Sequence, residues 1–478
     1  MSQAATMRVE AIVEPARPAR QTRVATVIGK VVFGSLLGLI VVTAIPYGTT
    51  QPWWRAAFVC ALFMLAILWL IEGYLENSWF GGIGWLVIPI VALAIFSLLQ
   101  TLQLPGTTAI RGLAGHVPWN AISADPYQTR FFILELLSLV IAGVLISRYA
   151  HSEKRVRLLM NLIVGVAATS ALFGILRQTA QHSVGFGLPL LAPDLGYAQF
   201  INKNHFAFLM EMSMGLVLGL VLASGAKRER LLVYLALLLP MWLGVVLSGS
   251  RGGLVAVMTQ ALVTVLLYGL VFRKAIDNDR RSRFARVTSH WAVRLVLILA
   301  LVAGVALGTL WVGGDRLART IEQSQTQLRE DNTNSQGVSR TEIWRATCKM
   351  FSAHPFLGVG MGAYWAAIPT FHDASGTMTP QEAHNDYLEI LASGGIVGFI
   401  LVAWFAVIVV KRTRENLASG NRFRRAAVMG ATIGITGVAV HSLLDFGLHT
   451  LVNALVFTTL LVIATSKRDW IERPTSYE

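Results

Sequence analysis

Two arginines in this 478-residue chain stand where helices are expected to begin. Residues 248–253 read Ser-Gly-Ser-Arg-Gly-Gly and predict a tight turn that presents Arg251. Residues 339–342 form an S-x-x-E capping box, which places Arg340 in the first turn of a helix ending before His354. A helix N-terminus carries free N–H donors and about half a positive charge, so an arginine beside it makes an anion site. Two such arginines suit a diphosphate, whereas a snorkelling anchor is the alternative for either alone.

A histidine stands at the next expected helix start. Residues 379–382 form a T-x-x-E box with proline at the first helical position, which predicts a membrane helix with His384 about one turn in. Arginines and positive helix ends nearby favour a neutral imidazole that can accept a proton, as a general base must. An interfacial polar residue without catalytic work is the alternative.

Metal chemistry finds little support in the sequence. The ten histidines include no H-E-x-x-H or similar spacing, and the D-x-D triplet at residues 277–279 lies in a run of arginines. Such a triplet is typical of a solvated charge cluster. We therefore expect neither a metal nor another cofactor at the site.

The composition is that of a membrane protein. Hydrophobic residues make up 54% of the chain and charged residues 14%, with a mean hydropathy of +0.59, against about 25% charged residues in soluble domains. Two cysteines, Cys60 and Cys348, are too few for a disulfide framework or a four-ligand zinc site.

Apolar runs of about 20 residues predict an all-α polytopic protein with about twelve transmembrane helices. The domains are then a tail (1–26), nine helices (27–312), a long loop with short helices (313–383), three helices (384–466) and a second tail (467–478). The predicted spans are 27–46, 54–72, 81–101, 130–147, 157–176, 204–224, 231–248, 251–272, 291–312, 384–410, 426–445 and 448–466.

The basic residues indicate which way the chain is inserted. With a cytoplasmic N-terminus, 27 of the 40 Lys and Arg residues fall in cytoplasmic segments, as the positive-inside rule requires. Membrane topology thereby explains the net charge of +14, and this charge is no longer an argument for nucleic-acid binding. The long loop 313–383 and the loops near 102–129 and 177–203 then share the outer side, where we expect the function to reside.

Charged residues inside membrane spans are costly and by default indicate function. Glu389 follows Glu382 and His384 in the expected helix, but five positions from His384 correspond to about 140°, a poor geometry for direct pairing. Asp445 and His449 flank the last hairpin at the same boundary as His384, and either line the same cavity or form its lip. The charged residues inside the predicted membrane spans are Glu72, Glu135, Glu211, Arg294, Glu389 and Asp445.

Four motifs in order resemble the O-antigen ligase and polymerase superfamily, whose members handle undecaprenyl-diphosphate-linked glycans in bacterial membranes. Together they cover about residues 196 to 400, and the first five predicted spans carry no such motif. The motifs are Asn-Lys-Asn-His-Phe-Ala at 202–207, the turn at 248–253, Ser-Arg-Thr-Glu-Ile-Trp at 339–344 leading to Pro-Phe-Leu-Gly-Val-Gly at 355–360, and His-Asn-Asp-Tyr-Leu-Glu at 384–389 with Gly394, Gly395 and Gly398.

The resemblance implies a GT-C-like helical fold in the bacterial inner membrane, with the active site on the periplasmic side. It implies metal-independent, inverting transfer, with Arg251 and Arg340 binding the diphosphate and His384 acting as the base. Asn204, Ser250 and Glu389 are candidate supporting residues within the motifs.

The donor implied is an undecaprenyl-diphosphate-linked glycan, and membrane lipids surround the site. The acceptor is lipid A core in a ligase of lipopolysaccharide biosynthesis, or a second lipid-linked glycan in a polysaccharide polymerase. A protein hydroxyl ranks third. A transporter of lipid-linked glycans is the alternative from another class, although matched broken helices in two inverted halves, its usual signature, are missing.

Overall fold

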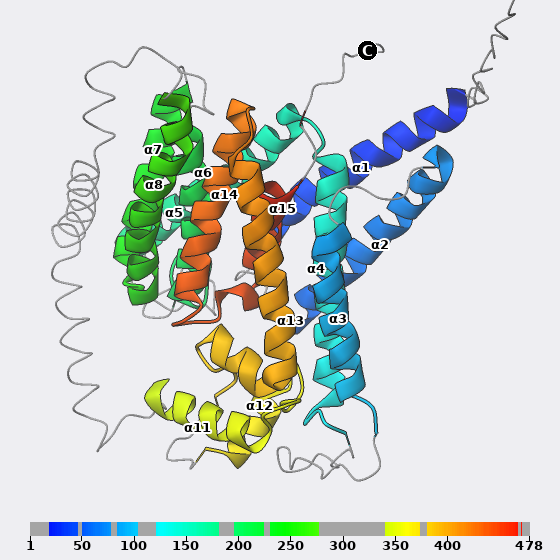
Figure 1. Ribbon diagram of the computed structural model, residues 1–478. Coiled ribbons are helices and arrows are strands. Elements are labelled where there is room, and N and C mark those ends of the chain that lie inside the picture. Colours follow the sequence, from blue (N-terminus) through cyan, green and yellow to red (C-terminus); the bar gives the residue numbers. More distant parts are fainter. Residues whose placement is uncertain are drawn as a thin grey trace, which may run out of the picture.

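The computed structural model is a bundle of long helices with a small helical layer at one end (Figure 1). It describes residues 19–45, 50–77, 84–103, 121–180, 196–223, 230–276, 340–372, 380–466 and 470. No strand occurs within these ranges, which contain only isolated β-bridges. The long helices are α1 (Ala19–Ala44), α2 (Pro52–Glu76), α3 (Gly84–Gln100), α4 (Pro126–Tyr149), α5 (Glu153–Ala180), α6 (Lys203–Leu222), α7 (Leu231–Ser248), α8 (Arg251–Ile276), α13 (Asp386–Leu417), α14 (Arg422–His441) and α15 (Leu451–Thr465). The end layer contains α11 (Arg340–Ala353), α12 (Tyr364–Ala367) and the short 3-10 turn η4 (Ile368–Thr370), and a second turn, η5 (Gly447–His449), precedes α15.

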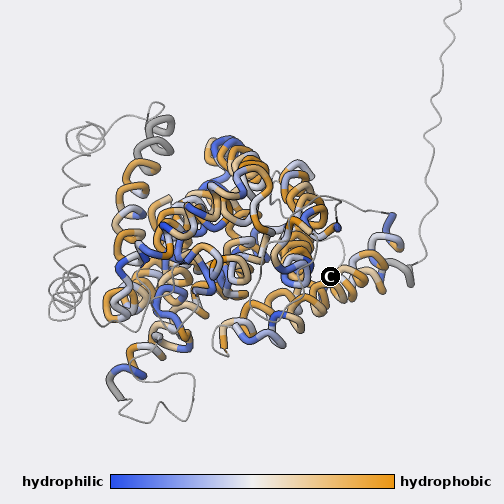
Figure 2. Tube along the Cα trace, turned by 90° about the horizontal axis from the view of Figure 1, so that it is seen from below, coloured by the Kyte–Doolittle hydropathy of each residue, from blue (hydrophilic) through white to orange (hydrophobic). Residues whose placement is uncertain are grey.

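The chain is a multi-pass membrane protein. Among the described helices, eight are long and apolar enough to cross a bilayer, and three shorter apolar helices overlap the predicted spans 81–101, 251–272 and 448–466. Apolar residues run along the helices (Figure 2), and many large ones, such as Leu232 and Val407, are exposed as lipid-facing residues must be. The predicted span 291–312 lies outside the described residues, so the count of twelve stays a prediction, as do the domain boundaries.

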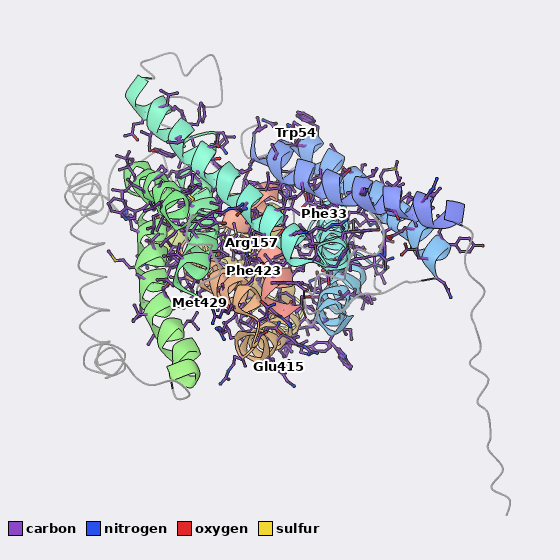
Figure 3. All side chains as sticks on the ribbon, turned by 90° about the horizontal axis from the view of Figure 1, so that it is seen from above. Phe33, Trp54, Arg157, Glu415, Phe423 and Met429 are labelled. Atoms are coloured by element: carbon purple, nitrogen blue, oxygen red, sulfur yellow. The ribbon has the colours of Figure 1, made fainter. Side chains whose placement is uncertain are left out.

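Basic side chains cluster at the end of the bundle opposite α11. Arg157 of α5 lies over the ring of Phe423, 4.1 Å from its centroid (Figure 3). Arg424 donates to the carbonyl of Ser466 at 2.7 Å and so ties α14 to the end of α15. This end is the one predicted to face the cytoplasm, so its arginines both stabilise helix ends and match the positive-inside pattern.

Helix α6 forms the centre of the bundle. In its apolar window 83% of the residues are buried, against 28% in α1 and 33% in α2. A Cβ added at Gly219 would lie 2.3 Å from the Gly430 nitrogen, and one added at Gly215 would lie 2.5 Å from the Gly434 nitrogen. Gly215 and Gly219 of α6 thus face Gly430 and Gly434 of α14. Each helix carries a G-x-x-x-G pair, which lets the two backbones touch.

Helix α13 is broken at Gly395, where φ is 60° and ψ is −163°. The loop that follows α11 fills the break, because Ile396 N donates to Pro355 O at 2.8 Å and Gly360 N donates to Ser393 O at 2.9 Å. Gln100 at the end of α3 clamps this loop. Its amide donates to Leu357 O at 2.6 Å and to Ser393 O at 3.0 Å. The α11 layer is thus anchored in the membrane bundle.

Candidate active site

The turn that carries Arg251 is built by its neighbours. Gly249 ends α7 in the left-handed region, with a φ of 65°, which costs glycine little. The Ser250 hydroxyl then accepts from Gly253 N at 3.1 Å and caps α8. Arg251 becomes the first residue of α8 and is exposed, with no acidic partner in the part of the chain that the structure describes. The sequence interpretation of this turn as a helix start is confirmed.

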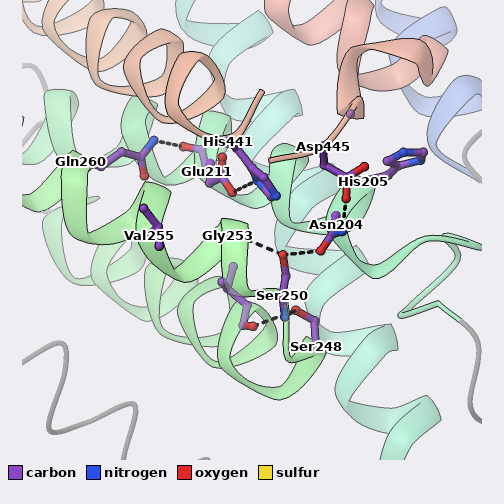
Figure 4. Close-up of polar contacts among 12 residues, drawn as sticks. Asn204, His205, Glu211, Ser248, Ser250, Gly253, Val255, Gln260, His441 and Asp445 are labelled. Atoms are coloured by element: carbon purple, nitrogen blue, oxygen red, sulfur yellow. Dashed lines mark hydrogen bonds and ion pairs between the residues drawn. The ribbon is translucent and has the colours of Figure 1, made fainter. Parts of the chain in front are cut away.

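A hydrogen-bonded chain joins this turn to two other segments (Figure 4). Ser250 donates to the side-chain oxygen of Asn204 at 2.7 Å. The amide nitrogen of Asn204 donates to Asp445. Asn204 itself sits in the first turn of α6, capped by Asn202, whose side chain accepts from Asn204 N at 2.8 Å. Two of the three supporting candidates, Asn204 and Ser250, therefore lie in one network.

Asp445 is the point where the candidate residues converge. Arg340 Nη2 lies 3.0 Å from one carboxylate oxygen of Asp445, and His384 Nδ1 lies 3.4 Å from the other. The Asp445 side chain is 1% exposed, whereas those of Arg340 and His384 are 46% and 31% exposed. A shielded carboxylate thus holds two groups that both reach the surface.

The electrostatics of Asp445 favour its ionised form. Burial raises the pKa of a carboxyl, but contact with His384 and the positive charge of Arg340 outweigh burial and hold the pKa of Asp445 below its usual range. Arg251 lies close enough to Arg340 for the two charges to interact. The site therefore pairs two arginines, one fixed anion and one imidazole, a set that can bind a dianion and move a proton.

Helix α11 begins at Arg340 and ends at Ala353, as the sequence predicts. Its position fixes His384 as well as Arg340, because Trp344 Nε1 donates to the carbonyl of Ala383 at 3.0 Å. Thr347 shares a 2.7 Å hydrogen bond with Tyr364 and so joins α11 to α12 within the end layer. One short helix thereby orients both a candidate phosphate ligand and the candidate base.

The predicted helix start before His384 is wrong. Helix α13 begins at Asp386, and Asn385 is its N-cap, with its side chain accepting from Tyr387 N and Leu388 N at 3.1 Å each. His384 therefore precedes the helix and has a φ of 51°. Glu382, which the box would turn back to the helix, instead faces His449. The helix is capped by Asn385, which directly precedes the apolar run, and not by the T-x-x-E box. Thr379, the first residue of that box, lies outside the described residues.

A second polar group lies across the ring of Phe446. The ring contacts His384 edge-on at a centroid distance of 4.8 Å and His449 at 5.5 Å. His449 Nδ1 lies 3.1 Å from Glu382 Oε1, and its Nε2 lies 3.7 Å from Asp386 and 3.9 Å from Glu389. Glu389 thus belongs to this group, whereas the carboxylate that His384 faces is that of Asp445.

Charge interactions dominate this second group. Desolvation opposes protonation of His449, but Glu382 and the two other carboxylates raise the pKa of its imidazole well above the ordinary value. The ligand atoms of Glu382, Glu389 and His449 lie within 4.8 Å of one another, close enough for a metal ion. The sequence analysis missed this group because it is assembled from separate segments and not from a local ligand motif.

The other charged residues of the described spans pair with side chains other than Asp445. Glu72 pairs with Arg148 at 2.9 Å, Glu135 pairs with Arg55 at 2.5 Å, and Glu211 pairs with His441 at 2.7 Å. Arg294 and the triplet at 277–279 lie outside the described residues. The sequence left open whether Asp445 and His449 line the same cavity as His384 or form its lip. In the structure, Asp445 contacts the candidate base His384, whereas His449 lies on the other side of the Phe446 ring.

Comparison with known families indicates the kind of protein that carries this site. A family model described as O-antigen ligase matches residues 235–403. Residues 235–403 are thus similar to the O-antigen ligase family, and this match supports the O-antigen ligase and polymerase superfamily. The matched segment is less than half of the chain; it contains Arg251, Arg340 and His384 and ends before Asp445. No curated protein matches the chain. The match supports a membrane enzyme of the O-antigen ligase/polymerase type, a glycosyltransferase-like class that belongs to lipopolysaccharide biosynthesis.

Proposed function

We propose that the enzyme transfers a glycan from an undecaprenyl-diphosphate carrier to an acceptor hydroxyl, without a metal and with inversion at the anomeric carbon. The observation that carries the proposal is the convergence of Arg340 and His384 on the buried carboxylate of Asp445, beside Arg251. Fixed cations neutralise a leaving diphosphate as a metal ion would. The protein lies in the bacterial inner membrane, with this site on the periplasmic side.

The proposed reaction gives each of these residues a role. His384 takes the proton of the acceptor hydroxyl, and the oxygen attacks the anomeric carbon of the first sugar. The bond from that carbon to the diphosphate oxygen breaks, and undecaprenyl diphosphate leaves with its charge held by Arg251 and Arg340. Asp445 lies 3.4 Å from His384 Nδ1 and stabilises the imidazolium that forms. The imidazolium then releases its proton to water.

The proposed acceptor is lipid A core, as in O-antigen ligases. The alternative within the superfamily is a second lipid-linked glycan, as in polymerases, and a protein hydroxyl ranks third. Deleting the gene and separating the surface glycans by gel distinguishes the first two. Loss of a ligase leaves bare core, with long polymer stranded on the lipid carrier. Loss of a polymerase leaves core bearing one repeat unit. Unchanged ladders would exclude both roles in a host with no second copy of the activity.

A transporter of lipid-linked glycans is the alternative from another class. Transport needs a polar path through the bundle, whereas the candidate residues gather at one end and Met212, Leu216 and Val217 in the middle of α6 are fully buried apolar side chains. Flipping of a labelled lipid-linked glycan in vesicles that contain the protein would favour the transporter.

Metal independence is tested with purified enzyme and a lipid-diphosphate-linked glycan donor. The transfer rate should be unchanged in a chelator, because the arginines carry the leaving-group charge. The Glu382→Gln variant removes a carboxylate of the compact group around His449 and serves as the control. Loss of activity that magnesium or manganese restores in the wild type would contradict the mechanism, and would assign it to that group if Glu382→Gln no longer responds to metal.

A further inference from the structure

A buried glutamate and histidine lie next to the site and take no part in the proposed reaction. His441 Nδ1 lies 2.7 Å from Glu211 Oε1, and both side chains are 0% exposed. Glu211 comes from α6 and His441 from the last turn of α14, one turn before Asp445 (Figure 4). Ionisable residues this deep in a membrane protein are costly, so their presence calls for a function.

The ring of His441 sets the approach of the helix that carries Arg251. One face of the ring stacks on Phe208, with centroids 4.1 Å apart and planes 20° from parallel. Its edge touches Gly252, where an added Cβ would lie 2.4 Å from both Cδ2 and Nε2. Gly252 directly follows Arg251, so a turn of this ring would displace the first turn of α8 and the guanidinium with it.

The backbone of His441 sets the place of Asp445. Its carbonyl accepts from Leu444 N at 2.8 Å and from Asp445 N at 3.1 Å. The turn after α14 is therefore built on the same residue whose ring supports α8. Glu211 fixes the orientation of the ring, and the ring and carbonyl together fix the two segments that carry Arg251 and Asp445.

The helices on which the pair sits are tied together on its other side. Gln260 of α8 donates to Glu211 O at 3.0 Å and to Ile433 O of α14 at 3.1 Å. The pair lies between this bridge and the site (Figure 4). The hydrogen bonds of Gln260 on one side and the ring of His441 on the other leave α8 little freedom to move relative to α6 and α14.

Stability alone does not explain such a pair. Replacing a buried ion pair by apolar side chains of similar size is often neutral or stabilising. We propose that Glu211 and His441 are positioning residues that hold Arg251 and Asp445 at the separation that diphosphate transfer requires. This inference rests on the proposed function.

The test is the apolar double variant Glu211→Leu/His441→Leu, assayed per folded molecule. We expect a thermal midpoint equal to or above that of the wild type, a donor KM raised about tenfold and a kcat lowered at least tenfold, since small misplacements at a catalytic site cost about that much or more. The conservative variant Glu211→Gln keeps an acceptor oxygen for His441 Nδ1 and should retain most of the activity.

The matched control is the ion pair at the opposite end of the bundle. Arg148 Nε lies 2.9 Å from Glu72 Oε2, and each side chain is 8% exposed. Glu72→Leu/Arg148→Leu should leave kcat and KM per folded molecule unchanged. Wild-type kcat and KM in the Glu211→Leu/His441→Leu variant would overturn the inference. If that variant does not fold, His441→Gln replaces it, because glutamine still donates to Glu211 but lacks the ring that touches Gly252; wild-type kinetics in His441→Gln would then overturn the inference.

Binding of undecaprenyl diphosphate, measured by native mass spectrometry, separates this inference from the proposed function. Arg251→Ala should lose the ligand, and the double variant should bind it more weakly. If Arg251→Ala binds as the wild type does, the proposed function fails. If Arg251→Ala loses binding while the double variant binds and turns over normally, only the positioning role fails.

Discussion

At the scale of single residues, Asp445 explains how the site combines a cation with a base. One oxygen of its carboxylate pairs with Arg340, and the other faces His384. Asn204 connects the carboxylate to the turn of Arg251 through hydrogen bonds with Asp445 and Ser250. Removing its charge leaves the imidazole without the anion that stabilises its protonated form. Asp445→Asn should therefore lower turnover by up to about 10⁴, the loss seen when the orienting carboxylate of a catalytic triad is neutralised.

The stability difference between the wild type and Asp445→Asn should depend on pH. Because the folded-state pKa of Asp445 lies below its ordinary value, its contribution to stability is complete above the ordinary carboxyl pKa of about 3.9 and is lost as the pH falls through the lower folded-state value. The wild type should exceed Asp445→Asn in thermal midpoint at pH 7, and the difference should shrink below about pH 4. Unfolding scans from pH 3 to pH 7 check this. A difference independent of pH would mean that the carboxylate is not ionised in the folded protein.

The sequence could predict that Arg251 and Arg340 stand at helix starts, because local turn and capping signals place them there. The T-x-x-E box at residues 379–382 is a local signal of the same kind that failed, because Asn385 caps α13 instead. The sequence could not predict the pairing of His384 with Asp445, because those residues meet only when α13 and the turn after α14 pack together. For the same reason, Glu211 was recognisable as a deep charge but its partner His441 was not.

At the scale of elements, close helix contacts fix the frame on which the site is built. The broken helix α13, the inserted loop and Gln100 are joined by long-range hydrogen bonds, which periodicity does not reveal. The apolar runs predicted where the helices lie. They did not reveal that α6 and α14 touch through their glycines, since a G-x-x-x-G spacing also occurs in α1 at Gly34 and Gly38, where added Cβ atoms meet nothing within 4 Å.

That difference gives a prediction for Gly219. Gly219→Ala places a Cβ 2.3 Å from the Gly430 nitrogen and should lower the free energy of unfolding by roughly 1–3 kcal/mol through overpacking. Gly38→Ala is the control and should be neutral or stabilising by up to about 1 kcal/mol through helix propensity. Thermal unfolding in detergent measures both. Equal effects of the two substitutions would refute the close contact between α6 and α14.

At the scale of the whole molecule, charge and polarity are divided between the two ends of the bundle. The α11 layer and the candidate site occupy one end, and Arg157, Arg424 and their neighbours occupy the other. Composition predicted this division, because the positive-inside rule depends on counts of residues and not on contacts.

The division predicts the topology. Reporter fusions after Gly362, next to α12, and after Gly420, between α13 and α14, should report opposite sides of the membrane, because the candidate membrane span α13 lies between them, whereas α12 and η4 are too short to cross. A C-terminal fusion should agree with the one after Gly420, since α14 and α15 add two crossings. The same side for Gly362 and Gly420 would contradict the assignment of α13 as a membrane span.

The most direct measurement of the central claim is the transfer rate per folded molecule for Arg251→Lys, Arg340→Lys and His384→Ala. The lysine variants keep the charge but lose the two-pronged grip on phosphate oxygens and should lose about 10²–10³ in rate. His384→Ala should lose about 10²–10⁴ with donor binding nearly intact, since the imidazole acts on the acceptor proton. Arg345→Ala, at an exposed position of α11, is the control and should turn over normally. Near-normal rates in all three site variants, with only the protein yield reduced, would contradict the account.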